Sequence, residues 1–177
     1  MPVWACAASA QASPAAAATA VTLTPATKQE GFTPIAGSVV TIGYTTLGTV
    51  AALVKVDARE LHASDGTAAR GLVVEVYQSQ YHQESAFVDP DEIDELIRGI
   101  DALLAVQTNP TAFQQFEVRY TTKGALQLAA FNGPAVRGIR FMIQAGRGVP
   151  AQTDVNEKDF RAFRALIVAA QEKLRAP

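Results

Sequence analysis

The sequence is poor in the residues on which most recognisable sites depend. Its 177 residues include one cysteine, Cys6, and two histidines, His62 and His82. A single cysteine allows no intramolecular disulfide, and the chain has neither a Cys-x-x-Cys motif nor the Cys/His spacing of a metal site. Two scattered histidines are more typical of surface residues than of a shared metal centre. We therefore expect no disulfide, no metal and no cofactor.

Long apolar runs are absent as well. The longest are far shorter than the roughly 20 residues that a membrane span needs, so no spanning segment is expected. Apolar residues make up 49% of the chain and charged residues 18%, a globular composition in a length typical of one domain. The net charge of −2 argues against nucleic acid or an anionic membrane as the main partner.

Charge is distributed unevenly along the chain. Residues 1–110 carry 5 basic and 12 acidic side chains, whereas residues 111–177 carry 10 basic and 5 acidic ones. This asymmetry predicts either two electrostatically different surfaces or two halves that attract each other.

The N-terminal stretch lacks charge and any regular apolar period. Residues 1–20 are rich in alanine, and Ala8-Ser9-Ala10 has the form of a signal-peptidase site with cleavage near Gln11. A basic leader and most of an apolar core are missing, so the stretch is either a truncated signal peptide or a flexible tail. Residues 21–37 contain repeated Pro and Gly and predict an irregular lead-in, with one short strand at 21–24.

The second half shows the clearer secondary-structure pattern. Phe116, Val118 and Tyr120 alternate with polar residues, which is the period of a strand with one apolar face. Apolar residues recur at helical spacing after Asn156, the expected helix cap. The predicted order is strand 116–120, turn 122–124, strand 126–130, strand 139–143, Gly/Pro loop 146–150 and a helix from Asn156.

The first half repeats this plan, and its helix has the strongest local signal in the chain. Asp89 is the predicted cap, Pro90 the first helical residue and Glu92 the partner that closes a capping box, which indicates a helix over 90–106. The predicted order is a strand that passes through Val40 and Ile42, a segment Tyr44–Gly48 that matches Tyr120–Gly124 and so places a turn at 46–48, a strand over 50–61, a turn at Asp65-Gly66, a strand over 72–76 and the helix.

Together the two halves predict an α+β fold. We expect a tandem β-β-β-α pseudo-repeat with antiparallel sheets and one helix per unit, because three strands and a helix are too few to bury both faces alone. Unit one spans 38–110 and unit two 111–177, packed as a single pseudo-twofold domain over 38–177.

Two segments carry a resemblance to known proteins. The run Glu84-Ser85-Ala86-Phe87-Val88-Asp89-Pro90-Asp91-Glu92-Ile93 and the run Phe116-Glu117-Val118-Arg119-Tyr120-Thr121-Thr122 resemble uncharacterised, often exported bacterial proteins that share an E-S-x-x-x-D-x-D-E-I stretch. This resemblance spans about residues 70–175 and implies no assigned activity. At the level of fold, strands followed by a helix in two units resemble the Whirly-type single-strand DNA-binding proteins, which use four strands per unit and a basic sheet.

The candidate site residues fall into two groups. Arg119 and Arg140 are expected to share the face opposite the apolar stripe of the second sheet, with Arg147 in the following loop. Tyr81, His82 and Glu84 lie in the segment that enters the first helix and are expected in a loop. The serines beside His82 lack a nucleophile-elbow motif, and Gly146-Arg147-Gly148 is not a phosphate-binding loop, so no catalytic residue is assigned. The acidic run at 89–95 is explained by helix capping and a solvated helix face.

The sequence therefore favours an exported, non-enzymatic binding or interaction module in the periplasm or medium, with the cytoplasm as the alternative location. The expected partner is a protein or an acidic ligand. The alternatives are a single-strand nucleic-acid-binding protein of Whirly-like form and a hydrolase without a recognisable motif.

Overall fold

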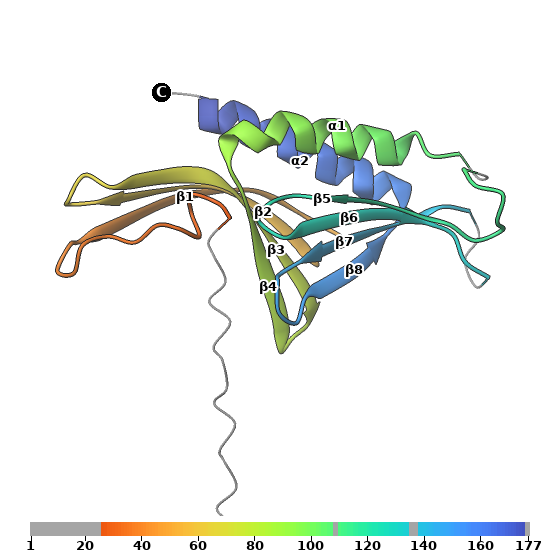
Figure 1. Cartoon of the computed structure of the whole chain (residues 1–177), viewed down its shortest axis with the longest axis horizontal. Coiled ribbons are helices and arrows are strands. Elements are labelled where there is room, and N and C mark those ends of the chain that lie inside the picture. Colours follow the sequence, from red (N-terminus) through yellow and green to blue (C-terminus); the bar gives the residue numbers. More distant parts are fainter. Residues whose placement is uncertain (1–25, 108–109, 135–137, 176–177) are drawn as a thin grey trace, which may run out of the picture.

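The described part of the chain folds into two antiparallel sheets and two helices, an α+β architecture. The computed structural model describes residues 26–107, 110–134 and 138–175. Sheet one has the order β1-β2-β3-β4 and sheet two the order β5-β6-β7-β8 (Figure 1). The strands are β1 (Val40–Val50), β2 (Val54–Ala63), β3 (Ala68–Ser79), β4 (His82–Val88), β5 (Glu117–Thr121), β6 (Leu126–Phe131), β7 (Arg140–Ala145) and β8 (Ala151–Val155). A 3-10 turn, η1 (Pro90–Glu92), precedes α1 (Ile93–Leu104), and α2 (Glu157–Arg175) follows β8.

Each half contains four strands before its helix, whereas the sequence predicts three. The additional strands are β4, where a loop was expected around His82 and Glu84, and β8, in a segment for which the sequence predicted no element. In β8 only Ala151, Thr153 and Val155 are buried, and such small side chains give a weak apolar signal. Backbone pairing with β3 and β7 nevertheless holds these segments in strand conformation.

The first hairpin also differs from the expectation. The expected turn at 46–48 is instead part of β1, with a register shift between Thr46 and Gly48. The chain reverses instead at Ala51 and Ala52, whose φ angles are 50° and 57°. Alanine seldom adopts this left-handed conformation, so the sequence carries no glycine signal for the turn. The expected strand over 50–61 accordingly begins only at Val54.

The two predicted helix caps have different outcomes. Asn156 is confirmed, because its Oδ1 accepts a hydrogen bond of 2.9 Å from the N–H of Asp159. Asp89 makes no side-chain cap, and the helix begins with a 3-10 turn rather than an α-helical one. The carboxylate of Asp89 accepts hydrogen bonds from the N–H of Lys28, and that of Glu92 accepts one from the N–H of Lys123. Tertiary partners have replaced the local ones.

The helices are exchanged between the halves. α1 follows sheet one but contacts β5 and β6 of sheet two, while α2 follows sheet two and contacts mainly β1, β2 and β3 of sheet one. Figure 1 shows both helices lying together over the sheets. The shared core includes Leu72, Leu128 and Phe163, with the rings of Phe141 and Phe160 stacked at a centroid distance of 4.5 Å. Burying one such side chain contributes about 1.5–3 kcal/mol, so each half depends on the other.

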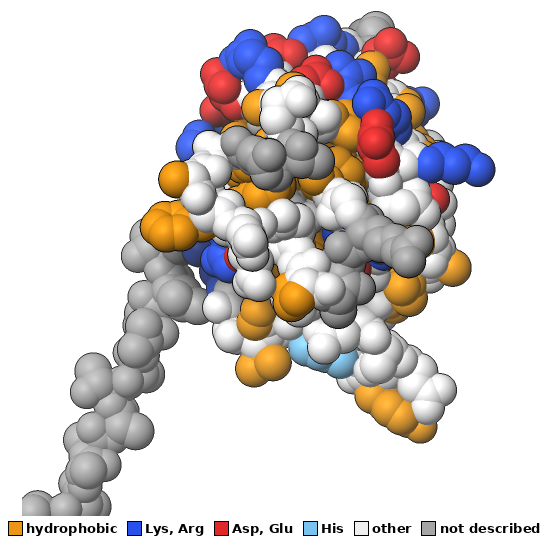
Figure 2. All heavy atoms as spheres, turned by 90° about the vertical axis from the view of Figure 1, so that its right-hand side faces the viewer, with side chains coloured by type: hydrophobic (Ala, Val, Ile, Leu, Met, Phe, Trp, Pro, Cys, Tyr) orange, Lys and Arg blue, Asp and Glu red, His pale blue; other side chains and the backbone are white. Residues whose placement is uncertain are grey.

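Ion pairs between the acidic first half and the basic second half form where the two halves meet. The ion pairs that join described residues of the first half to those of the second are Glu30–Arg147, Asp101–Arg164 and Asp94–Arg175. In each pair the acid comes from the first half and the base from the second. This agrees with the expectation that the halves attract each other. Figure 2 shows charged side chains of both signs gathered at the end of the molecule where the helices lie.

The lead-in lies against the outer face of sheet one, opposite the helices. Thr27 and Gln29 are buried there. A Cβ on Gly71 would lie 2.5 Å from Nε2 of Gln29 and 2.6 Å from the backbone oxygen of Val88, which cannot rotate away, so glycine is needed here. The predicted strand at 21–24, the expected signal remnant or tail at 1–20 and Cys6 lie outside the described residues.

Candidate functional site

The outer face of sheet two holds two of the predicted residues. Arg119 and Arg140 share the face opposite the buried stripe, as expected, since they pair in register with Ala129 and Phe131. Both nitrogens of the Arg119 fork donate to Glu117, at 2.5 and 2.9 Å. This pairing reduces the capacity of Arg119 to bind an anion, and it leaves a face of mixed charge.

Tyr81, His82 and Glu84 lie at the β3–β4 hairpin rather than in a loop. Tyr81 is at the tip and is 91% exposed. The ring Nε2 of His82 lies 3.1 Å from the carbonyl oxygen of Val149. The side chain of Glu84 lies against Gly146, where a Cβ would be 2.9 Å from its Cγ. The hairpin therefore meets the β7–β8 loop, and two of its three candidate residues serve that contact.

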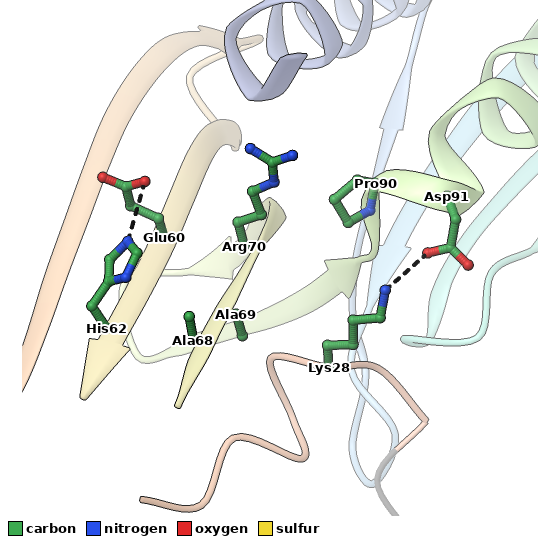
Figure 3. Close-up of a pocket in the computed structure, with 8 residues that line it drawn as sticks. All are labelled: Lys28, Glu60, His62, Ala68, Ala69, Arg70, Pro90 and Asp91. Carbon is green, nitrogen blue, oxygen red and sulfur yellow. Dashed lines mark ion pairs between the residues drawn. The ribbon is translucent and has the colours of Figure 1, made fainter. Parts of the chain in front are cut away.

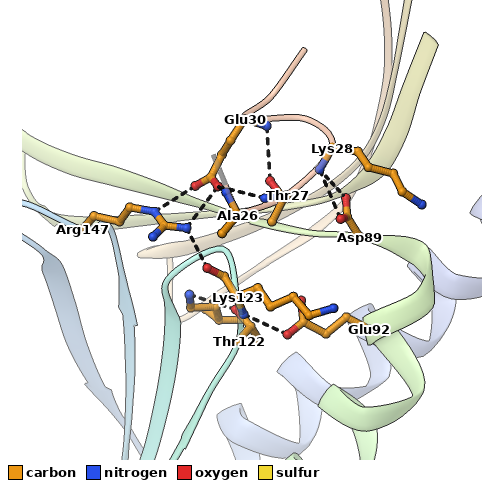
Figure 4. A network of polar contacts seen from close by, with 10 residues as sticks. Ala26, Thr27, Lys28, Glu30, Asp89, Glu92, Thr122, Lys123 and Arg147 are labelled. Carbon is orange, nitrogen blue, oxygen red and sulfur yellow. Dashed lines mark hydrogen bonds and ion pairs between the residues drawn. The ribbon is translucent and has the colours of Figure 1, made fainter. Parts of the chain in front are cut away.

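Arg147 belongs to a network that joins four segments (Figure 4). Its guanidinium donates to both carboxylate oxygens of Glu30 at 3.1 Å and to the carbonyl oxygen of Lys123 at 2.7 Å. A bidentate pair of this kind fixes geometry as well as charge. Through Lys123 and its bond to Glu92, the network ties the lead-in, the β5–β6 turn, the β7–β8 loop and the start of α1 together. Arg147 is consequently committed to the fold.

The electrostatics of Glu30 agree with this role. Burial raises the pKa of the Glu30 carboxyl, but hydrogen bonds from Arg147 and from the N–H groups of Ala26 and Thr27 lower it by more. The net pKa is below the ordinary value for glutamate, so Glu30 is ionised at neutral pH.

A second charged cluster lies on the outer face of sheet one. Nζ of Lys55 is 2.8 Å from Asp57, whose side chain is 2% exposed, and 3.3 Å from Glu75. Glu75 also accepts a hydrogen bond of 2.9 Å from the hydroxyl of Tyr77. The hydrogen bond to Asp57 is the main cause that raises the pKa of Lys55, and the bond to Glu75 raises that of Tyr77. Arg59 adds a second cation 3.8 Å from Glu75, so two basic side chains balance two acidic ones in this cluster.

Residues outside the two groups of candidate site residues line two neighbouring hollows. The first, of about 440 Å³, is lined by Lys28, Glu60, His62, Ala68, Ala69, Arg70, Pro90 and Asp91 (Figure 3). The second, of about 410 Å³, is lined by Gly43, Tyr44, Thr45, Ala58, Arg59, Glu60, Arg70, Lys173 and Leu174. They share Glu60 and Arg70, and we call the two together the Arg70 groove.

The Arg70 groove forms where the helix-facing side of sheet one passes the end of α2. Along β3 that side carries Val74 and Leu72 in the core, and the next residue of the same alternation is Arg70. In β2 the same face changes from Ala58 to Glu60 and His62. Charged side chains thus occupy the positions of the core stripe beyond the point where a helix covers it.

Most of the charges in the groove are positive. The lining contains four cations, Lys28, Arg59, Arg70 and Lys173, and two acids, Glu60 and Asp91. Lys28 lies 3.9 Å from Asp91, and Arg59 lies 3.8 Å from Glu75, outside the groove. Within the part of the chain that the structure describes, Arg70 and Lys173 form no ion pair. Arg70 and Glu60 are cross-strand neighbours, yet Figure 3 shows the Arg70 guanidinium pointing towards the helix above rather than at Glu60.

Sequence reasoning missed this groove for a physical reason. Its cations come from the lead-in, from two strands and from the end of α2, so no short motif contains them. The available signal was the alternation of apolar and polar residues along β2 and β3. Glu60 and Arg70 occupy positions at which this alternation predicts an apolar side chain.

Metal and membrane sites are not indicated within the described ranges. No group of three or more His, Cys, Asp and Glu side chains is close enough to hold a metal ion there. Neither α1 nor α2 is long and apolar enough to cross a membrane. No protein-family model matches the sequence, and no curated protein matches it.

Proposed function

We propose that the protein is a non-enzymatic binding module that takes an anionic group, a carboxylate or a phosphate, in the Arg70 groove. One observation carries the proposal: the helix-facing stripe of sheet one changes from apolar to charged where α2 ends, and neither Arg70 on this stripe nor Lys173 at the end of α2 has an ion-pair partner among the described residues. Charged residues at core-stripe positions give no packing benefit, which is a reason to assign them a binding role.

The chemistry of the groove suits an anion. A guanidinium donates two parallel hydrogen bonds to a carboxylate or phosphate, and charge-assisted bonds are stronger than neutral ones. Lys173 adds a compact positive charge from a different element. Glu60 limits the net positive charge, so the groove is suited to one anionic group beside polar or apolar contacts rather than to a polyanion.

The experiment is a calorimetric titration of the whole protein with inorganic phosphate and with a short glutamate peptide as separate probes. We expect Arg70→Glu to weaken binding of the preferred probe by about tenfold or more, because a lost charged hydrogen bond costs about 1.5–3 kcal/mol. Arg140→Glu on the outer face of sheet two is the matched control and should have little effect. Binding that is insensitive to Arg70→Glu, or no binding of either probe at low salt, would overturn the proposal.

The alternative, a single-strand nucleic-acid-binding protein of Whirly-like form, gains support from the four strands per half, the strand number of that fold. The outer face of sheet two has mixed charge, however, with Glu117 and Asp154 beside the arginines. This alternative predicts salt-sensitive single-strand binding that is lost when Arg119 and Arg140 are reversed in charge.

We further propose that the halves are copies of one unit packed about a pseudo-twofold axis. The exchanged helices support this, because α1 of the first half packs on sheet two in the same way that α2 of the second half packs on sheet one. The pairing supports it as well: Val56 pairs with Gly48 and Val74, and Leu128 pairs with Tyr120 and Ile143. By this register Gly48, not Tyr44, is the counterpart of Tyr120.

Export remains part of the proposal on sequence grounds alone. The Ala8-Ser9-Ala10 stretch supports it. The test is N-terminal sequencing of the protein recovered from its natural host, in which a first residue near Gln11 supports export and an intact Met1 contradicts it.

A further inference from the structure

Among the strands that the structure describes, β1 is the least protected sheet edge. It is the outer strand of sheet one and pairs with β2 on one side, while no other described strand pairs with its opposite side. Figure 1 places β1 in the part of sheet one away from sheet two. Its sequence, VTIGYTTLGTV, spans 11 residues without a charge or a proline.

The other three edge strands differ in this respect. β4 contains Glu84, β5 contains Glu117 and Arg119, and β8 contains Asp154. Charges on an edge strand oppose pairing with another chain, and soluble proteins commonly use them for that purpose. β1 alone lacks this protection, although it is the longest of the four edges.

The exposed side chains of β1 also form a one-sided apolar stripe. Val40, Ile42 and Tyr44 alternate on the outer face of the sheet and are 36%, 56% and 69% exposed. Thr41, Gly43 and Thr45 occupy the opposite face. Large apolar residues in a row along an open edge indicate a surface that is covered in the functional assembly.

We propose that β1 pairs with β1 of a second copy of this chain to form a twofold dimer with a continuous eight-stranded sheet. A twofold axis perpendicular to the sheet makes the pairing antiparallel and keeps the same face of both copies on the same side. The stripes of Val40, Ile42 and Tyr44 from the two copies then join on that side. Because the strand is uncharged, its pairing with itself places no like charges opposite each other.

This pairing rests on the β1 edge and requires no bound anion, although it brings the two Arg70 grooves to either side of the axis. Gly43, Tyr44 and Thr45 line the groove as well as the edge. A dimer would therefore present two grooves facing the same seam.

The test is the mass of the full-length protein in solution, measured by light scattering after size-exclusion chromatography. We expect a dimer, and we expect Ile42→Lys and Tyr44→Lys each to give a folded monomer, with folding checked by circular dichroism. Tyr81→Lys, at the exposed hairpin tip, is the matched control and should stay dimeric. A wild-type monomer at every concentration would overturn the proposal, and so would a dimer that persists in both β1 variants. A monomer that binds an added extended peptide along β1 would assign the edge to a different partner and would also overturn it.

Discussion

Gly99 of α1 lies so close to Tyr120 of β5 that a Cβ on the glycine would be 2.6 Å from Cδ2 of the ring. The corresponding contact of the other helix reverses the sizes, since Leu166 of α2 lies over Gly48 of β1 and a Cβ on Gly48 would be 2.9 Å from Cδ2 of the leucine. In one half the sheet supplies the large side chain, and in the other the helix supplies it. Each exchanged helix thus packs on its sheet through one glycine in close contact with one large side chain.

This relationship predicts an unusual effect of Gly99→Ala. In an exposed helix interior the change would stabilise the protein by about 1 kcal/mol. Here the methyl group collides with a half-buried ring, so we expect a net destabilisation of about 1–3 kcal/mol, measured by urea unfolding. In a Tyr120→Ala background the collision is absent, and Gly99→Ala should then be neutral or stabilising. A stabilising effect in the wild-type background would contradict the contact.

Gly124 predicts a larger effect at the junction of the sheets. A Cβ there would lie 1.7 Å from the carbonyl oxygen of Phe87, which is a backbone atom and cannot rotate away. Gly124→Ala must therefore break the bridge between Phe87 and Gly124, and we expect it to cost more than about 2 kcal/mol of unfolding free energy. Gly133→Ala, with no atom within 4 Å, is the control and should change stability little. Equal losses of stability in the two variants would show that Gly124 is not in close contact with the backbone of Phe87.

The ion pair between Lys55 and Asp57 on the outer face of sheet one gives a third prediction. Lys55→Ala leaves the carboxylate of Asp57, which is 2% exposed, without its cation. Removing one partner of a buried pair costs about 3–5 kcal/mol, and partial exposure of Lys55 places the expected loss near the lower end. Arg98→Ala, which removes an exposed pair with Glu95, should cost less than about 1 kcal/mol. Urea denaturation of both variants measures the difference, and similar losses would contradict the burial of Asp57.

The hydrogen bonds that Asp65 accepts from the lead-in and the residues after it predict a specific pH dependence of stability. The carboxylate of Asp65 accepts hydrogen bonds from the N–H groups of Ile35 and Thr67 and from the hydroxyl of Ser38, and these lower its pKa from 3.8 to about 2. A carboxyl whose pKa is lower in the folded protein than in the unfolded chain stabilises the fold at pH values above the pKa of the unfolded chain. This stabilisation is lost as the pH falls towards the pKa of the folded protein. The stability difference between the wild type and Asp65→Asn should therefore be constant above about pH 4 and shrink between about pH 4 and pH 2. A difference that does not change over this range would show that the carboxylate is not held in this way.

Local signals in the sequence predicted local structure well. Asn156 and Asp159 are three residues apart, and their cap forms as the pattern indicates. Asp89 and Glu92 show an equally good pattern, but they bond to Lys28 and Lys123, which come from distant parts of the chain. A capping motif read from sequence cannot reveal such competitors. The turn at Ala51 and Ala52 was missed for a related reason, because the packing of β1 and β2 imposes a backbone conformation that alanine does not signal.

The candidate site could be predicted only in part. The shared face of Arg119 and Arg140 follows from alternation alone and is confirmed. The sequence did not show that Glu117 pairs with Arg119 or that Glu30 binds Arg147, because side-chain partners depend on tertiary contacts. The Arg70 groove requires knowing where α2 ends over a sheet that belongs to the other half, which depends on the exchange of helices.

The most direct test of the account is to map the binding surface by NMR. Backbone amide shifts of the labelled protein would be followed while the probe that binds in calorimetry is added. We predict that the largest changes cluster at Glu60, Arg70 and Lys173, at the end of sheet one, and that they vanish in Arg70→Glu. Changes clustered instead around Arg119 and Arg140 on the outer face of sheet two, or none at all, would contradict the assignment of the groove.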